Sequence, residues 1–204
     1  MNSFNEVKIA NQIWMDQNLN VDVFRNGDPI TEAKTAEAWV KACREGNPAW
    51  CYYDNNPANG KKYGKLYNFH AAKDLRGVAP EGWHVPTDNE WLDALSICFT
   101  LFSKTFVTFL TKPNAGSTMK STSGWIKNGT NKSGFTGLPG GMRQPGADFD
   151  FIGKFGTFWT QNAYKNIKGN LEPIVYILKG DNDKVTRMNI GYGSGISIRC
   201  IKNK

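Results

Sequence analysis

Two histidines, four cysteines and a few paired acidic residues have the greatest capacity for chemistry in this 204-residue chain. His70 and His84 are the only imidazoles that a general base or a multi-histidine metal site could use. His84 precedes a helix start signal in the string Gly-Trp-His-Val-Pro, and His70 follows an Asn-Phe pair. We predict that both side chains are structural, with His84 making hydrogen bonds and His70 packed.

The cysteines lack a metal-binding or redox motif. Cys43, Cys51, Cys98 and Cys200 include no C-x-x-C pair, and no histidine stands at zinc-finger spacing from them. They are predicted to be buried free thiols. A disulfide is the alternative, since four cysteines allow three pairings and the spacing does not choose among them.

Two acidic pairs invite comparison with catalytic and calcium sites. Asp148 and Asp150 are candidates for paired carboxylates, and Asp181 with Asp183 stands like the start of a calcium loop. The second pair lacks the glycine and terminal glutamate of an EF-hand, so a tight turn between two strands explains it better. Glu172-Pro173 is similar to the Glu-Pro-Asn element of calcium-dependent lectins, but an isoleucine replaces the amide ligand. We therefore predict no metal and no cofactor.

Motifs for ester and nucleotide chemistry are missing from the sequence. No serine has the G-x-S-x-G context of a hydrolase nucleophile, and no phosphate loop of the G-x-x-x-x-G-K-[ST] type occurs. Gly191, Gly193 and Gly195 alternate without the third-glycine spacing of a dinucleotide fingerprint. They are predicted to form a turn.

The charge and hydropathy of the chain narrow the class of partner. A net charge of +7 favours acidic partners, but the lysines are scattered and no arginine-rich run is present, so nucleic-acid binding is not predicted. No stretch approaches the roughly 20 apolar residues that span a bilayer, and the opening segment lacks the apolar core of a signal peptide. We expect a soluble chain without a membrane span, and its compartment stays open.

The elements that position these residues begin with sheet. Val7 and Ile9, then Ile13 and Trp14, alternate with polar residues and predict two strands joined at residues 10–12. Helical spacing follows over residues 31–43. The apolar face predicted for this helix comprises Ala36, Trp39, Val40 and Cys43.

A second helix has the stronger start signal. Thr87 and Glu90 form a capping box, after which apolar residues recur at helical spacing. The predicted apolar face comprises Trp91, Ala94, Leu95, Cys98 and Phe102. This helix is expected to pack on the main sheet.

The C-terminal half is predicted to be loop followed by strands. Residues 112–160 are rich in glycine, serine, asparagine and proline, yet their aromatic density indicates an ordered, packed loop region. Residues 174–178, 184–188 and 196–201 are predicted strands, separated by turns at 181–183 and 191–195. The fold class is therefore α+β in one domain, with two helices packed on an antiparallel sheet and long ordered loops.

Six blocks along the chain resemble the Fibrobacter succinogenes major paralogous domain over residues 7–201. They are WMDQNL at 14–19, PAWCYYDN at 48–55, YGKLYN at 63–68, GWHVPT at 82–87 with Glu90-Trp91, SGF at 133–135 with LPGG at 138–141, and SIRC at 197–200. The resemblance implies a C-type-lectin-like fold, related to formylglycine-generating enzymes and to variable proteins diversified by retroelements. It also implies a surface or ligand-binding role in a bacterium or phage.

The resemblance further implies a non-enzymatic recognition protein. The enzyme relatives use a cysteine pair, and no two cysteines are close in this sequence, so an oxidase is the weaker alternative; a carbohydrate-binding surface domain is another. Residues 146–159 look like the stretch that diversified members vary, followed by Gln161, Asn162, Tyr164, Asn166 and Asn170. Phe158-Trp159 stands where many members carry two tryptophans.

A contact face for a protein or glycan on a cell or phage surface is predicted near the C-terminus. Tyrosine supplies large contacts at small rotamer cost, and asparagine supplies adaptable hydrogen bonds. The predicted ligand-binding residues are Asp150, Lys154, Phe155, Thr157, Gln161, Asn162, Tyr164, Met188, Asn189 and Tyr192.

Overall fold

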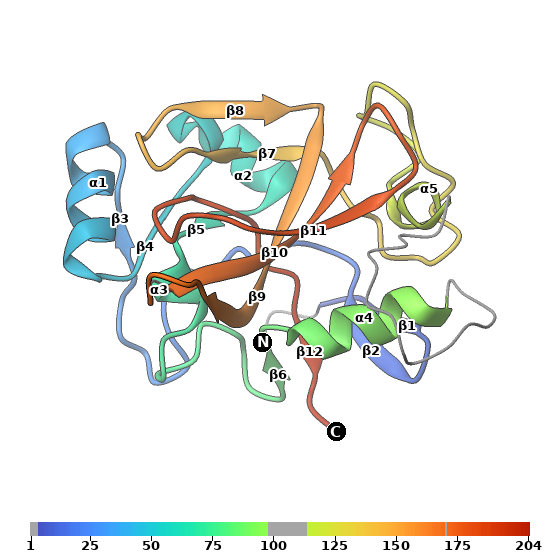
Figure 1. Ribbon diagram of the computed structural model, residues 1–204, viewed down its shortest axis with the longest axis horizontal. Coiled ribbons are helices and arrows are strands. Elements are labelled where there is room, and N and C mark those ends of the chain that lie inside the picture. The colour runs from blue at the N-terminus through green and yellow to red at the C-terminus, as the bar shows by residue number, and fades with distance from the viewer. Residues whose placement is uncertain (1–3, 98–113, 170) are drawn as a thin grey trace.

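The computed structural model describes residues 4–97, 114–169 and 171–204 (Figure 1). Three sheets with short helices around them make an α+β fold. Cys98, Phe102 and Asn170, named in the predictions above, lie outside the described residues.

The largest sheet has five strands in the order β11-β10-β9-β7-β8. Its strands are β7 (Gly140–Arg143), β8 (Phe149–Ile152), β9 (Phe155–Lys165), β10 (Leu171–Lys179) and β11 (Val185–Asn189). The expectation of an antiparallel sheet is right for most of it, but β7 pairs with β9 in parallel. The sheet is mixed because β9 lies between β7 and β10, and β8 reaches the outer edge through a hairpin with β7.

The middle of this sheet is buried on both faces. Successive side chains of a strand point to opposite faces. Along β10, Val175 and Ile177 join one hydrophobic cluster, whereas Tyr176 and Leu178 join another. The centres of β9 and β10 therefore carry no exposed side chains for recognition.

The two chain termini meet in the second sheet, whose order is β1-β2-β12-β6. The strands are β1 (Glu6–Ile9), β2 (Gln12–Met15), β6 (Trp83–His84) and β12 (Ile201–Lys202). The predicted N-terminal strand pair is confirmed. The predicted strand at 196–201 is wrong for most of its length, because that segment makes only isolated bridges, at Ile196 and Ser197, before β12.

A third sheet, β3-β4-β5, is short and packs near the first helix. It consists of β3 (Thr31–Glu32), β4 (Ala49–Cys51) and β5 (Leu66–Tyr67). Thr31 pairs with Ala49 in parallel, so it belongs to a strand and not to the helix predicted over 31–43.

Helix α1 (Ala36–Glu45) starts at the Thr35 cap, whose hydroxyl accepts from the Ala38 amide, and ends at Gly46 with φ of 76°. Its buried residues are Trp39, Ala42 and Cys43. The predicted face is shifted by part of a turn, because Ala36 and Val40 are exposed and Ala42 takes their place against the core.

Helix α4 (Asp88–Ile97) confirms the predicted capping box. The Glu90 amide donates to the Thr87 hydroxyl at 3.1 Å, and the Thr87 amide donates to the Glu90 carboxylate at 2.8 Å. Trp91 is buried and stacks on Tyr176 with ring centroids 4.7 Å apart. The helix therefore packs on the main sheet, as predicted.

The remaining helical segments are shorter. They are a 3-10 turn at Tyr53–Asn55, α2 (Pro57–Tyr63), α3 (Phe69–Ala72) and α5 (Ala115–Met119). No helix among the described residues is both long and apolar enough to cross a membrane.

The predicted loop region at 112–160, which the structure describes from residue 114 on, is ordered and mostly loop, as predicted, but strands run through it. It contains β7, β8 and the first half of β9, while Trp125 and Phe135 are buried as the aromatic density indicated. Gly141 is one reason why the sequence did not predict strand β7. It has φ of 67°, and a β-carbon there would lie 2.6 Å from the Asp150 carbonyl oxygen, so only glycine lets β7 approach β8.

Two fully buried guanidinium groups hold the loops around the sheets. Arg143 donates to the carbonyls of Ala33 at 2.6 Å and Ala147 at 3.0 Å. Arg199 donates to Asn18 Oδ1 at 2.7 Å and to the Phe135 carbonyl, and burial lowers its pKa to about 9. Arg199 does not reach solvent, because loop carbonyls surround it.

Candidate functional site

The two histidines make structural hydrogen bonds. His84 lies 2.7 Å from Asn203 through Nδ1 and 2.9 Å from Glu90 through Nε2, so it ties the C-terminal strand to α4. His70 Nε2 lies 3.2 Å from the Cys43 carbonyl oxygen, and burial lowers the pKa of His70. Both geometries agree with the predicted structural roles.

The thiols of Cys43, Cys51 and Cys200 are free and buried, which confirms the prediction for these three; Cys98 is outside the described residues. Desolvation raises the pKa of Cys51 and of Cys200 to about 12. It also raises the pKa of Cys43. Because the thiolate is the reactive form, these groups are held in their unreactive state.

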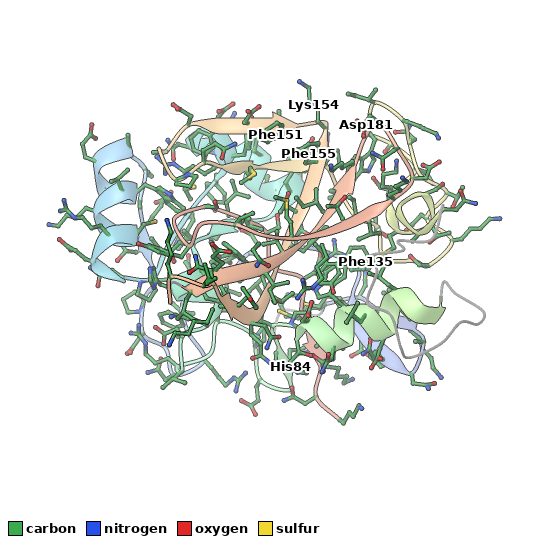
Figure 2. All side chains as sticks on the ribbon, in the orientation of Figure 1. His84, Phe135, Phe151, Lys154, Phe155 and Asp181 are labelled. Carbon is green, nitrogen blue, oxygen red and sulfur yellow. The ribbon has the colours of Figure 1, made fainter. Side chains whose placement is uncertain are left out.

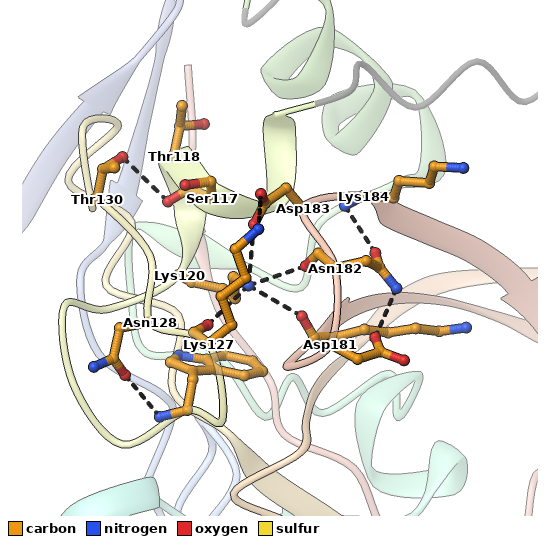
Figure 3. Close-up of polar contacts among 12 residues, drawn as sticks. Ser117, Thr118, Lys120, Lys127, Asn128, Thr130, Asp181, Asn182, Asp183 and Lys184 are labelled. Atoms are coloured by element: carbon orange, nitrogen blue, oxygen red, sulfur yellow. Dashed lines mark hydrogen bonds and ion pairs between the residues drawn. The ribbon is translucent and has the colours of Figure 1, made fainter.

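The acidic pairs do not form a metal site in the part of the chain that the structure describes. Asp148 and Asp150 are exposed near and on β8. Asp181 and Asp183 lie in the turn between β10 and β11, as predicted. Asp183 binds two lysine ammonium groups, Lys127 at 2.7 Å and Lys120 at 3.4 Å (Figure 3).

Lys120 holds this turn from inside the protein. Its side chain is fully buried, and its ammonium donates to the carbonyls of Lys127 at 3.1 Å, Lys179 at 3.2 Å and Asn182 at 3.0 Å. Carbonyl and carboxylate oxygens arranged in this way are also typical calcium ligands. A tethered ammonium therefore occupies the place that a bound cation would take, which the sequence did not indicate.

The predicted contact face is divided between two ends of the main sheet. Strand β9 has 11 residues, and it pairs Phe155 with Lys179 at one end and Lys165 with Leu171 at the other. At about 3.3 Å per residue, these ends lie roughly 30 Å apart. The predicted residues therefore cannot all contact one small epitope.

We call the first group the turn end, consisting of the β8–β9 turn at 151–155 and the β10–β11 turn at 179–184. The rings of Phe151 and Phe155 stack with centroids 4.4 Å apart, and the Gly180 amide donates to the Lys154 carbonyl at 2.7 Å. Figure 2 shows Lys154 and Asp181 on the same side of the molecule, far from His84. Of the predicted residues, Asp150, Lys154 and Phe155 lie at or beside this end.

We call the second group the hairpin end, consisting of Gln161, Tyr164, Ile167 and Leu171. Two other predicted residues lie elsewhere: Met188 pairs with Val175 in the middle of β10, and Tyr192 follows β11 and contacts the His70 ring. Among the described residues, ten large hydrophobic side chains are exposed, and three of them, Tyr164, Ile167 and Leu171, belong to this group. Ile167 is 102% exposed, Tyr164 56% and Leu171 52%. A cluster of exposed apolar side chains of this kind is typical of an interaction surface.

Comparison with known sequences assigns the chain to a family. The sequence model of the Fibrobacter succinogenes major domain matches residues 7–202. The chain belongs to this family. No curated protein and no solved structure matches it. The resemblance carried by the six sequence blocks is thus confirmed at the level of the family.

Three of the residues predicted to contact a ligand in this Fibrobacter succinogenes major domain have other environments. Thr157 is 1% exposed, because β9 is covered on both faces at that point, and its place in the contact face is wrong. Asn162 accepts from the Asp88 amide at 2.7 Å and so binds the first turn of α4. Asn189 donates to Glu172 at 3.5 Å.

Ile167 and Leu171 were missed by the sequence reasoning. Ile167 lies in the turn between β9 and β10, and Leu171 is the first residue of β10. Both stand among lysine, asparagine and glycine. An isolated apolar residue in a polar turn is a usable signal, but only once both flanking strands are recognised. Strand β9 was predicted as loop, so the turn itself was not identified.

Proposed function

We propose that this Fibrobacter succinogenes major domain is a non-enzymatic recognition module that binds a protein partner through the hairpin end. The observation that carries the proposal is the concentration of exposed Tyr164, Ile167 and Leu171 on one strand-supported hairpin. Apolar and aromatic anchors supply most of the binding energy in protein interfaces.

Polar contacts support the hairpin end from inside. Glu172 lies opposite Tyr164 in the β9–β10 register, and its carboxylate accepts from Asn166 at 2.8 Å and from Asn189 at 3.5 Å. These bonds link the hairpin to the end of β11. A hairpin held in this way loses less conformational freedom on binding, which favours affinity.

The charge around the hairpin end favours an acidic partner. Lys165 and Lys168 are exposed beside Ile167. The nearby carboxylate of Glu172 is only partly exposed and is engaged by two asparagines. Complementary charge at the rim of an interface mainly raises the association rate and the specificity.

Two finer features belong to the proposal. A C-type-lectin-like scaffold is supported by the family resemblance and by mixed sheets whose termini pair with each other. Diversification by a retroelement is supported by the asparagine and tyrosine content of residues 161–192. A neighbouring reverse transcriptase gene and a near-copy of these codons that differs at adenines are the genomic observations that test it.

The binding experiment compares serine substitutions of two fully exposed aliphatic residues, one in the hairpin and one outside it. A photo-crosslinking residue at Ile167 first identifies the partner in cells that carry the gene, and the purified partner is then titrated. Ile167→Ser is expected to weaken binding at least tenfold, because it removes a fully exposed anchor. Leu75→Ser is the matched control, since Leu75 is 103% exposed in the segment after α3, and it should bind normally. Equal binding by both variants would refute the hairpin end as the contact surface.

The oxidase alternative has a separate test. With Cys98 replaced by serine, a thiol reagent should fail to label the native protein and should label all three remaining cysteines in urea, because Cys43, Cys51 and Cys200 are buried. Rapid labelling of one thiol in the native protein would support the oxidase alternative.

A further inference from the structure

A cleft of about 650 Å³ lies beside the segment that follows β2. It separates the segment that follows β2 from the C-terminal turn of α2. No residue of the hairpin end contributes to it. The lining residues that a ligand would contact are Phe4, Gln17, Asn20, Lys61, Lys62 and Leu138.

The cleft is built on a fixed backbone. Gly64 has φ of 76°, and a β-carbon there would lie 2.8 Å from the Leu19 carbonyl oxygen, so glycine allows the two walls to meet. Asn18 donates to the Tyr63 carbonyl at 2.8 Å and accepts from the buried Arg199 at 2.7 Å. The buried guanidinium therefore holds both walls in place, and the cleft is preformed.

The polar groups that face solvent in the cleft are largely uncommitted to the fold. Gln17 and Asn20 are exposed, and the Asn20 amide makes only a long contact of 3.5 Å with the Gly60 carbonyl. Side-chain amides offer both donors and acceptors, which suits hydroxyl groups. Phe4 and Leu138 add partly buried apolar surface.

The charge in the cleft is predominantly positive. Lys61 and Lys62 are exposed, and neither has a carboxylate within 4.0 Å among the described residues. The acidic lining residue is Asp16, whose Oδ2 lies 3.5 Å from the Asn5 amide. A ligand with an anionic group is favoured over a neutral one.

We infer that this cleft binds a short acidic oligosaccharide. The lysines bind its carboxylate, the amides of Gln17 and Asn20 bind its hydroxyls, and the apolar wall receives a ring face. The volume is within the range of clefts that hold small ligands and suits two or three sugar units. This binding is independent of the protein partner proposed for the hairpin end.

Titration of the full chain with trigalacturonic acid tests the inference, with maltotriose as the neutral control of the same length. The acidic sugar should bind, weaken as salt is raised, and shift the amide resonances of residues 17–20 and 60–64. Maltotriose should bind at least tenfold more weakly. Absence of binding, or equal binding of both sugars, would overturn the inference.

Variants locate the binding. Lys61→Gln with Lys62→Gln should weaken trigalacturonic acid binding at least tenfold, and Asn20→Trp should block the cleft. Lys41→Gln with Arg44→Gln removes two exposed cations from the last part of α1 and is the matched control. Unchanged binding in the Lys61/Lys62 variant would overturn the site. Ile167→Ser should leave sugar binding intact, which separates this result from the test of the hairpin end.

Discussion

The turn end and the hairpin end of the main sheet differ in how they meet solvent. At the turn end, the buried Lys120 ammonium contacts three carbonyl oxygens and Asp183. At the hairpin end, Ile167 in the turn and Leu171 at the start of β10 are exposed, and Glu172 accepts a hydrogen bond from Asn166 in the turn. The same strands β9 and β10 connect both ends.

This difference separates stability from recognition. A buried cation with oxygen partners contributes to folding because removing it leaves desolvated oxygens unpaired. An exposed apolar side chain contributes little to folding and is available to a partner. Changes at the turn end should therefore act on the free energy of unfolding, and changes at the hairpin end on binding.

The largest expected effect on stability is at Lys120. Lys120→Met keeps the length of the side chain and removes the ammonium, so we expect the free energy of unfolding to fall by about 3 kcal/mol in urea titration. A loss within about 0.5 kcal/mol would show that the turn end does not depend on this cation. Restoration of part of the loss by added calcium would identify the oxygen cage as a latent cation site.

A smaller effect is expected at Asp183. Asp183→Asn keeps the shape but weakens two hydrogen bonds to ammonium groups, so the free energy of unfolding should fall by about 1.5 kcal/mol at neutral pH. Equal stability of the two proteins at pH 7 would contradict this contribution.

The same carboxylate predicts a pH dependence. Its hydrogen bond with Lys127 and the nearby Lys120 charge lower the pKa of Asp183 below its usual 3.8. A lowered folded-state pKa gives stability that is complete above the unfolded pKa and is lost as pH falls through the folded value. Between pH 5 and pH 2, wild type should therefore lose more stability than Asp183→Asn, as followed by the melting temperature. Parallel loss in both would exclude Asp183 as a source.

Lys127 allows a comparison of an exposed with a buried cation, because it binds the same Asp183 carboxylate as Lys120 but from the surface. Its side chain is 59% exposed, whereas that of Lys120 is fully buried. Lys127→Met should cost about 0.5 kcal/mol, since exposed ion pairs contribute little. A loss as large as that of Lys120→Met would show that burial is not what distinguishes the two lysines.

The smallest expected effect on stability is at the hairpin end. Ile167→Ser with Leu171→Ser should change the free energy of unfolding by no more than about 0.5 kcal/mol, because both side chains are mostly exposed. A clear destabilisation in urea titration would mean that these residues support the fold, and the contrast between the two ends would fail.

Local elements were the most predictable part of the fold. The capping box of Thr87 and Glu90, the N-terminal strand pair and the turn at 181–183 all follow from residues close in sequence. Strands β7, β8 and the first half of β9 were missed. Phe158 and Trp159 are buried on opposite faces, so β9 lacks the polar alternation that marks a strand with one exposed face.

The candidate site was predicted only in part. Tyr164, Met188 and Tyr192 are exposed, and Tyr164 lies near the β9–β10 hairpin. Thr157 is buried, and Phe155 lies at the other end of β9. Composition indicated which residue types suit binding, but it carried no information on which of them share an end of the sheet.

By itself, the sequence determined the family, the α+β class and the elements that depend on nearby residues, because caps and turns are satisfied within a few positions. Only the tertiary structure decided which residues lie at each end of the main sheet and where the buried cations lie. Lys120 meets Asp183 across 63 residues, and Arg199 meets Asn18 across 181. Such contacts depend on how the strands pair and pack, and no local pattern of residues encodes them.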